Sequence, residues 1–154
     1  MKEIKRIASF SVDHTTLTPG IYVSRVDGDV VTYDLRTRVP NSDALMDHET
    51  MHTVEHMLAT YLRNSAIAQD VIYFGPMGCQ TGFYLLVRHA DNGAVLAAVK
   101  DALEKKLAHE GEVFGASAVE CGNYRTLDLA KAKSEAGNYL AVLNGKKEWS
   151  FSYE

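Results

Sequence analysis

The sequence is poor in cysteine and proline and contains no long apolar run. Its 154 residues include two cysteines, three prolines and eleven glycines. Two cysteines cannot form the disulfide framework of a small secreted domain, and so little proline and glycine excludes collagen-like and low-complexity chains. The longest apolar runs, such as residues 83–87, are far shorter than the ~20 residues that a membrane-spanning helix needs. The sequence therefore predicts no membrane partner.

Neither sign of charge dominates the composition. Sixteen basic and twenty acidic residues give a formal net charge of −4, so the basic excess of a nucleic-acid-binding protein is absent. The N-terminal ten residues mix charged and apolar side chains without the apolar segment of a secretory signal, and we expect a cytoplasmic protein. Hydrophobic residues make up 46% of the chain, which is enough for the core of one domain over residues 1–154.

Strand patterns dominate the first half of the chain. Segments 21–26 and 30–39 are rich in β-formers and flank an Asp-Gly turn, which predicts a hairpin. Segments 71–74 and 80–88 predict two further strands joined by a turn that contains Gly-Pro-Met-Gly. Segment 113–121 is compatible with a strand or an extended stretch.

Helical periodicity follows between and after these strands. Apolar residues recur at helical spacing over 47–66 and 92–109, and Asp128 is placed to cap a last helix that ends near Asn144-Gly145. Strands grouped early, with helices distributed unevenly, are typical of an α+β domain and not of a βαβ repeat. We therefore expect a mainly antiparallel sheet packed against helices.

The most informative motif is His52-Thr53-Val54-Glu55-His56, an H-x-x-E-H pattern. On a helix, His52 and His56 are one turn apart on one face, which is the spacing that two histidine ligands of one metal ion require. Glu55 lies on the flank of the same face, where a general base is useful. Arg63 continues this face toward the C-terminus and would suit an anionic group of a substrate.

Two histidines do not complete a metal site, because a catalytic centre usually has three protein ligands and one open position. Cys79 and Cys121 are both candidates for the third ligand, and the residues around them do not decide between the two. Two other interpretations of the H-x-x-E-H motif also stay open. An inverzincin-type peptidase would use Glu120 or Glu135 as the third ligand, and a structural metal would require four protein ligands.

Taken together, the motifs resemble those of the S-ribosylhomocysteine lyase family (LuxS, the autoinducer-2 synthases). The resemblance covers nearly the whole chain, and the combination of motifs is far more specific than H-x-x-E-H alone. The matching segments are Ser9-Phe10, Asp13-His14, Asp34-Leu35-Arg36, His52 to His56, Gly75-Pro76-Met77-Gly78-Cys79-Gln80-Thr81-Gly82, and Glu120-Cys121-Gly122.

The resemblance implies roles for the residues at these positions. His52, His56 and Cys121 would bind one metal ion per subunit, Fe²⁺ in the active enzyme, with Zn²⁺ or Co²⁺ able to substitute. Cys79 and Glu55 would be the catalytic acid–base groups. The substrate pocket would contain Ser9, His14 and Arg36, and we add Arg63 as a partner for the homocysteine carboxylate.

The resemblance also implies a reaction and an assembly. S-ribosylhomocysteine would be cleaved to homocysteine and 4,5-dihydroxy-2,3-pentanedione by internal aldose–ketose shifts and a β-elimination. Such chemistry needs an acid and a base but no redox cofactor. The implied assembly is a homodimer with active sites at the subunit interface.

Overall fold

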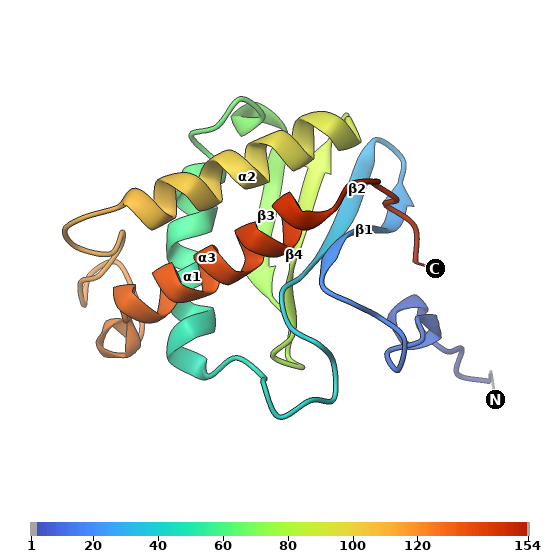
Figure 1. The fold of residues 1–154 in the computed structure, drawn as a ribbon, viewed down its shortest axis with the longest axis horizontal. Coiled ribbons are helices and arrows are strands. Elements are labelled where there is room, and N and C mark those ends of the chain that lie inside the picture. Colours follow the sequence, from blue (N-terminus) through green and yellow to red (C-terminus); the bar gives the residue numbers. More distant parts are fainter. Residues whose placement is uncertain (1–2, 154) are drawn as a thin grey trace.

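In the part of the chain that the structure describes, a four-stranded antiparallel sheet packs against three α-helices (Figure 1). The structure is a computed structural model that describes residues 3–153. The spatial order of the strands is β1-β2-β4-β3, with every neighbouring pair antiparallel. This architecture confirms the predicted α+β class. The strands are β1 (Gly20–Asp27), β2 (Val30–Arg36), β3 (Val71–Pro76) and β4 (Gly82–Arg88).

Each of the three α-helices begins after an aspartate. The side chains of Asp47, Asp91 and Asp128 each accept a hydrogen bond from the backbone N–H three residues ahead, which satisfies a donor that the first helical turn leaves free. Within residues 3–153, no helix has the length and apolar character needed to cross a membrane. The helices are α1 (His48–Leu62), α2 (Asn92–Ala108) and α3 (Leu129–Gly145), with 3₁₀ turns η1 (Ala8–Ser11), η2 (Ala68–Asp70) and η3 (Tyr124–Thr126).

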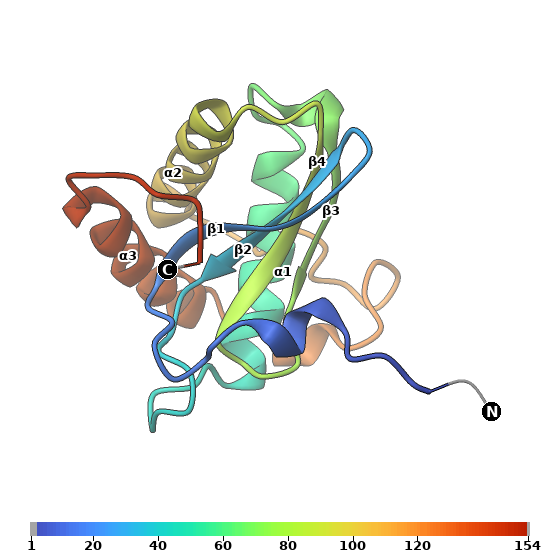
Figure 2. The same cartoon turned by 90° about the vertical axis from the view of Figure 1, so that its right-hand side faces the viewer.

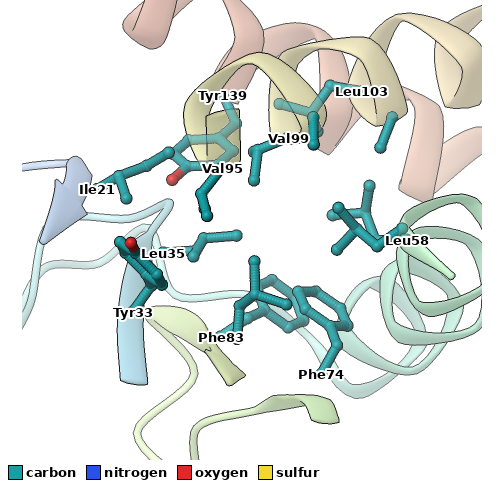
Figure 3. Close-up of a cluster of buried hydrophobic side chains, with 14 of the residues drawn as sticks. Ile21, Tyr33, Leu35, Leu58, Phe74, Phe83, Val95, Val99, Leu103 and Tyr139 are labelled. Carbon is teal, nitrogen blue, oxygen red and sulfur yellow. The ribbon is translucent and has the colours of Figure 1, made fainter. Parts of the chain in front are cut away.

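The helices lie on one face of the sheet, and the core fills the space between the two layers (Figures 2 and 3). Side chains of a strand alternate between its two faces. On β2, Tyr33 and Leu35 point into this core and are fully buried. Asp34 and Arg36 must therefore point to the opposite face, which the helices do not cover. The sheet thus carries its polar groups on the side away from α1.

Several of the predicted elements differ from the structure in their bounds; β3, for example, extends to Pro76 and β4 begins only at Gly82. Strand β2 ends at Arg36, and α1 ends at Leu62 because Asn64 Nδ2 and Ser65 Oγ donate to carbonyls of its last turn. Side-chain hydrogen bonds of this kind compete with the backbone hydrogen bonds of a helix and favour its termination. The segment 113–121 forms turns and bends and no strand.

Candidate metal centre and thiol pocket

Two histidines of α1 and a cysteine from a distant loop form a compact cluster of potential ligands. The ligand atoms of His52, His56 and Cys121 all lie within 4.8 Å of one another. Cys121 Sγ lies 3.4 Å from His52 Nε2, and the two imidazole centroids are 4.7 Å apart. The helical spacing of the histidines therefore produces the shared face that the sequence predicts, and the loop that follows α2 supplies the thiol.

Hydrogen bonds on the far side of both rings orient the histidines. His56 Nδ1 donates to the carbonyl oxygen of Phe114 at 2.7 Å. His52 Nδ1 lies 2.7 Å from Thr126 Oγ1, whose own hydrogen is donated to the carbonyl of Asn123. Both Nδ1 atoms therefore carry the proton, and both Nε2 atoms keep a free lone pair. Outer partners of this kind are typical of histidine ligands.

A glycine makes room for one of these rings. Gly115 has a φ of +71°, and a Cβ at this position would lie 3.1 Å from His56 Nδ1. A side chain would both strain the backbone and press on the imidazole. The loop after α2 can thus approach α1 closely only because residue 115 is glycine.

The donor set fits a divalent transition metal. Burial, assisted by the nearby His56 and His48, lowers the pKa of His52, which favours the neutral imidazole that binds a metal. Two imidazoles and one thiolate suit iron, cobalt and zinc, and three protein ligands leave a position for a substrate or water.

The carboxylates considered as alternative third ligands are engaged elsewhere. Glu135 is buried and accepts two hydrogen bonds from Arg38 Nε, and Glu120 accepts one from Ser117 Oγ. Neither belongs to the ligand cluster, whereas Cys121 does. This geometry gives no support to the peptidase arrangement of H-x-x-E-H with a distant glutamate.

Cys79 lies in a different place, beside a buried arginine. Arg36 is 3% exposed and makes two hydrogen bonds to Asp34, from Nε at 3.1 Å and from Nη2 at 2.6 Å. Its Nη1 donates to Thr81 Oγ1 at 2.7 Å and lies 3.8 Å from Cys79 Sγ. Although burial opposes it, the bonds and charge of Asp34 raise the pKa of Arg36, so the guanidinium is a permanent cation next to the thiol.

The turn between β3 and β4 holds Cys79 against this arginine. Gln80 adopts a φ of +66°, and its backbone and side chain bond to the main chain of Met46. A Cβ at Gly82 would come 2.6 Å from the Leu35 carbonyl oxygen, so only glycine permits this approach of β4 to β2. The Cys-Gln-Thr-Gly segment is therefore a turn shaped to present the exposed Cys79 thiol.

Cys79 lines a cavity of about 290 Å³ on the side of the sheet away from the helices. The cavity contains Ser9, His14 and Arg36, so the structure brings these three predicted pocket residues together with the thiol. His14 is fixed there by a 2.8 Å hydrogen bond between its Nδ1 and the Val12 carbonyl. None of the three residues of the metal cluster lines this cavity.

Glu55 and Arg63 are not brought to the cavity. Glu55 is half-buried on α1, between the two ligand histidines in sequence. Arg63 follows the last turn of α1, where its guanidinium donates to the carbonyls of Val71 and Ile72. The helical wheel predicts the direction in which the Arg63 side chain leaves the helix. It does not predict that carbonyls of β3 accept hydrogen bonds from this side chain.

Several residues of the two sites were not assigned a role from the sequence. Asp34 could have been found, because positions 34 and 36 share one face of a strand and carry opposite charges. Thr81, Thr126 and Tyr153 carry no comparable local signal. Tyr153 in particular reaches Asp34 across 119 positions of the sequence, at an O···O distance of 2.7 Å.

Comparisons with known proteins identify the family of the chain. The family model described as S-Ribosylhomocysteinase (LuxS) matches residues 7–149. Proteins named S-ribosylhomocysteine lyase from Desulfotalea psychrophila, Finegoldia magna and Borreliella afzelii are 45%, 43% and 42% identical to the chain. Each alignment covers 97% of this chain and 99% of the relative. The matched range includes His52, His56, Cys79 and Cys121, and the chain belongs to the S-ribosylhomocysteinase (LuxS) family.

Proposed function

We propose that the protein cleaves S-ribosylhomocysteine to homocysteine and 4,5-dihydroxy-2,3-pentanedione, the precursor of autoinducer-2. The observation that carries the proposal is that one chain contains both a His₂Cys ligand cluster and, in a separate cavity, a thiol beside a buried guanidinium. The two products together contain every atom of the substrate, so the reaction is an internal redox shift followed by an elimination. A carbon–sulfur lyase of this kind requires acid–base groups and a Lewis acid. Cys79 and Glu55 are suitable acid–base residues, and His52, His56 and Cys121 could hold a metal ion as the Lewis acid.

His52, His56 and Cys121 would hold one Fe²⁺ per subunit, with Zn²⁺ or Co²⁺ able to replace it. When bound, the ion supplies Lewis acidity that stabilises negative charge on the oxygens of the sugar. Zinc binds such sites more tightly than iron, so the metal present depends on supply as well as affinity. Thr126 and the Phe114 carbonyl keep both imidazoles in the tautomer that leaves Nε2 free.

Cys79 would move protons between neighbouring carbons of the sugar. Each aldose–ketose shift removes a proton from one carbon and delivers a proton to the next, so one group must act in turn as base and acid. The Arg36 guanidinium, whose Nη1 lies 3.8 Å from the sulfur, would stabilise negative charge on Cys79 when it acts as a base. Glu55 would remove the proton whose loss allows the homocysteine thiolate to leave from the β-carbon.

Ser9, His14 and Arg36 would bind the substrate in the cavity that Cys79 lines. Hydroxyl, imidazole and guanidinium groups can hydrogen-bond the sugar oxygens. A predicted contact of Arg63 with the homocysteine carboxylate would require its guanidinium to leave the carbonyls of Val71 and Ile72.

We propose further that a second copy of the chain completes each active site. The metal cluster includes α1 on the helical side of the sheet, whereas Asp34, Arg36 and the thiol cavity lie on the open side. Substrate must contact the metal and Cys79 at once. The open side also exposes Ile7, Phe10 and Tyr73, each more than half accessible, which a partner subunit would cover.

Homocysteine release tests the reaction. Protein loaded with Fe²⁺ under anaerobic conditions is expected to release one thiol per S-ribosylhomocysteine, detected with a thiol reagent. Cys121→Ala should lose bound metal and activity, whereas Cys79→Ala should keep the metal and lose activity. Absence of thiol release from folded, metal-loaded protein would refute the proposed reaction.

Light scattering tests the dimer, and a purely monomeric protein at micromolar concentration would refute the shared site. We also propose the cytoplasm as the location of the protein in the cell.

A further inference from the structure

The C-terminal segment 149–153 returns to the sheet and ends in the thiol cavity. Trp149 and Phe151 pack against the core, and the Phe151 carbonyl accepts a 2.7 Å hydrogen bond from Val23 N on β1. The ring of Tyr153 stacks on Tyr22 with centroids 5.1 Å apart. The last described residue is thus fixed by the strand, by the core and by a neighbouring aromatic ring.

The hydroxyl of Tyr153 hydrogen-bonds to the carboxylate of Asp34, which also orients Arg36. It donates to Asp34 Oδ2 at 2.7 Å, and Asp34 Oδ2 also accepts from Arg36 Nη2 at 2.6 Å. Burial, together with the charge of Asp34, raises the pKa of Tyr153, so the phenol remains a donor across the working pH range. Asp34 therefore lies between one permanent cation and one permanent neutral donor.

Arg36 connects the Asp34 carboxylate to the Cys79 thiol. Its Nη1 donates to Thr81 Oγ1 and lies 3.8 Å from Cys79 Sγ, and Thr81 Oγ1 lies 3.0 Å from the same sulfur. If Asp34 lost the hydrogen bond from Tyr153, its carboxylate would bind Arg36 more strongly. It would also keep more negative charge that no donor compensates. Both changes weaken the electrostatic support that Arg36 gives to a thiolate.

We infer that Tyr153 is a positioning residue for Cys79, acting through Asp34 and Arg36. The hydrogen bond from its hydroxyl stabilises part of the negative charge of Asp34, so that Arg36 stays aligned with the sulfur. The inference rests on the proposed use of Cys79 as an acid–base group. It assigns to the C-terminal segment a part in the thiol pocket in addition to its packing.

The test measures the reactivity of Cys79 and not lyase turnover. Metal-loaded protein is alkylated with iodoacetamide between pH 5 and 10, and modification of the Cys79 peptide is quantified by mass spectrometry. The charged and titratable groups around the sulfur are Arg36, Asp34, Tyr84, Tyr153 and His14. Only the hydroxyl of Tyr153 is altered in Tyr153→Phe, which keeps the stacked ring.

Tyr153→Phe is expected to slow alkylation of Cys79 at pH 7 about threefold and to move the pH profile upward by about half a unit, the size of one lost hydrogen bond. The matched control is Tyr22→Phe, which keeps the stack and removes a hydroxyl that bonds to Thr18 instead. It should leave the profile unchanged. A chain that ends at residue 152 should shift the profile at least as far as Tyr153→Phe.

An unchanged profile in Tyr153→Phe would overturn the inference, as would an equal shift in the Tyr22→Phe control, since packing of the segment would then be the cause. Metal content measured on the same samples shows whether the fold of the metal centre is intact. Alkylation needs no substrate, so its result does not depend on the lyase assay. If the proposed reaction is wrong, the wild-type protein will fail to release homocysteine, whatever the alkylation result.

Discussion

Lys106 is a fully buried lysine, and its removal is expected to stabilise the protein. The residue lies on α2 with 0% exposure, and its Nζ has no hydrogen-bond partner among residues 3–153. Burial lowers the pKa of Lys106 from 10.5 to about 7, while the charge of Glu135 acts in the opposite direction. Glu135 is already held by Arg38, so the ammonium gains little from it.

The pKa gives the size and the pH dependence of the effect. Each pKa unit corresponds to about 1.4 kcal/mol, so a fall from 10.5 to about 7 corresponds to as much as about 5 kcal/mol of lost stability. The unfolded chain binds the proton below pH 10.5, whereas the folded chain binds it only below about 7. The contribution of Lys106 is therefore most unfavourable at and below pH 7 and disappears as the pH approaches 10.5.

Urea unfolding of wild type and Lys106→Met at pH 7, 8 and 9 tests this reasoning. The variant should be more stable by several kcal/mol at pH 7, and the advantage should shrink by about 1.4 kcal/mol per pH unit. Lys105→Met is the matched control, because Lys105 is exposed and forms an ion pair with Asp101. It should change the free energy of unfolding by less than about 0.5 kcal/mol. A Lys106→Met variant that is destabilised, or whose advantage does not depend on pH, would refute the reasoning.

Three further predictions concern the metal centre and the helix that carries it. Thr126→Val should lower metal affinity about 10- to 100-fold, measured by competition with a chromophoric chelator, because His52 loses its outer partner; unchanged affinity would contradict this. Gly115→Ala should also weaken metal binding, because its Cβ would press on the His56 ring. Gly111→Ala is the control: its φ is also positive, but its Cβ would have no atom within 4 Å, so it should affect stability alone. Asp47→Ala should lower the free energy of unfolding by about 1 kcal/mol at pH 7. Because bonds from Lys131 and Thr50 lower the pKa of Asp47 to about 2, this loss should be complete above pH 4 and vanish as the pH falls below 2.

The local parts of the fold could be predicted from the sequence. Helix starts at Asp47, Asp91 and Asp128 depend on a side chain and a backbone N–H three residues apart. The common face of His52 and His56 likewise depends only on helical geometry. The architecture follows from the order of these elements, and the structure confirms it.

The parts that depend on distant contacts could not be predicted in this way. An arginine on a strand is usually solvated, yet Arg36 is buried because Asp34 and Thr81 satisfy its donors. Arg63 lies on the predicted helical face but is bound by carbonyls of β3. The link from Tyr153 to Asp34 joins residues 119 positions apart and has no local signal.

Mixing two inactive variants tests the central claim most directly. Cys79→Ala retains the His52, His56 and Cys121 cluster, and Cys121→Ala retains the Cys79 thiol. A mixed dimer would therefore contain one intact site if each proposed site combines both chains. Random exchange of subunits, confirmed by native mass spectrometry, should then restore about one quarter of the wild-type rate of homocysteine release. No release from confirmed mixed dimers would contradict an active site built from the metal cluster of one subunit and Cys79 of the other.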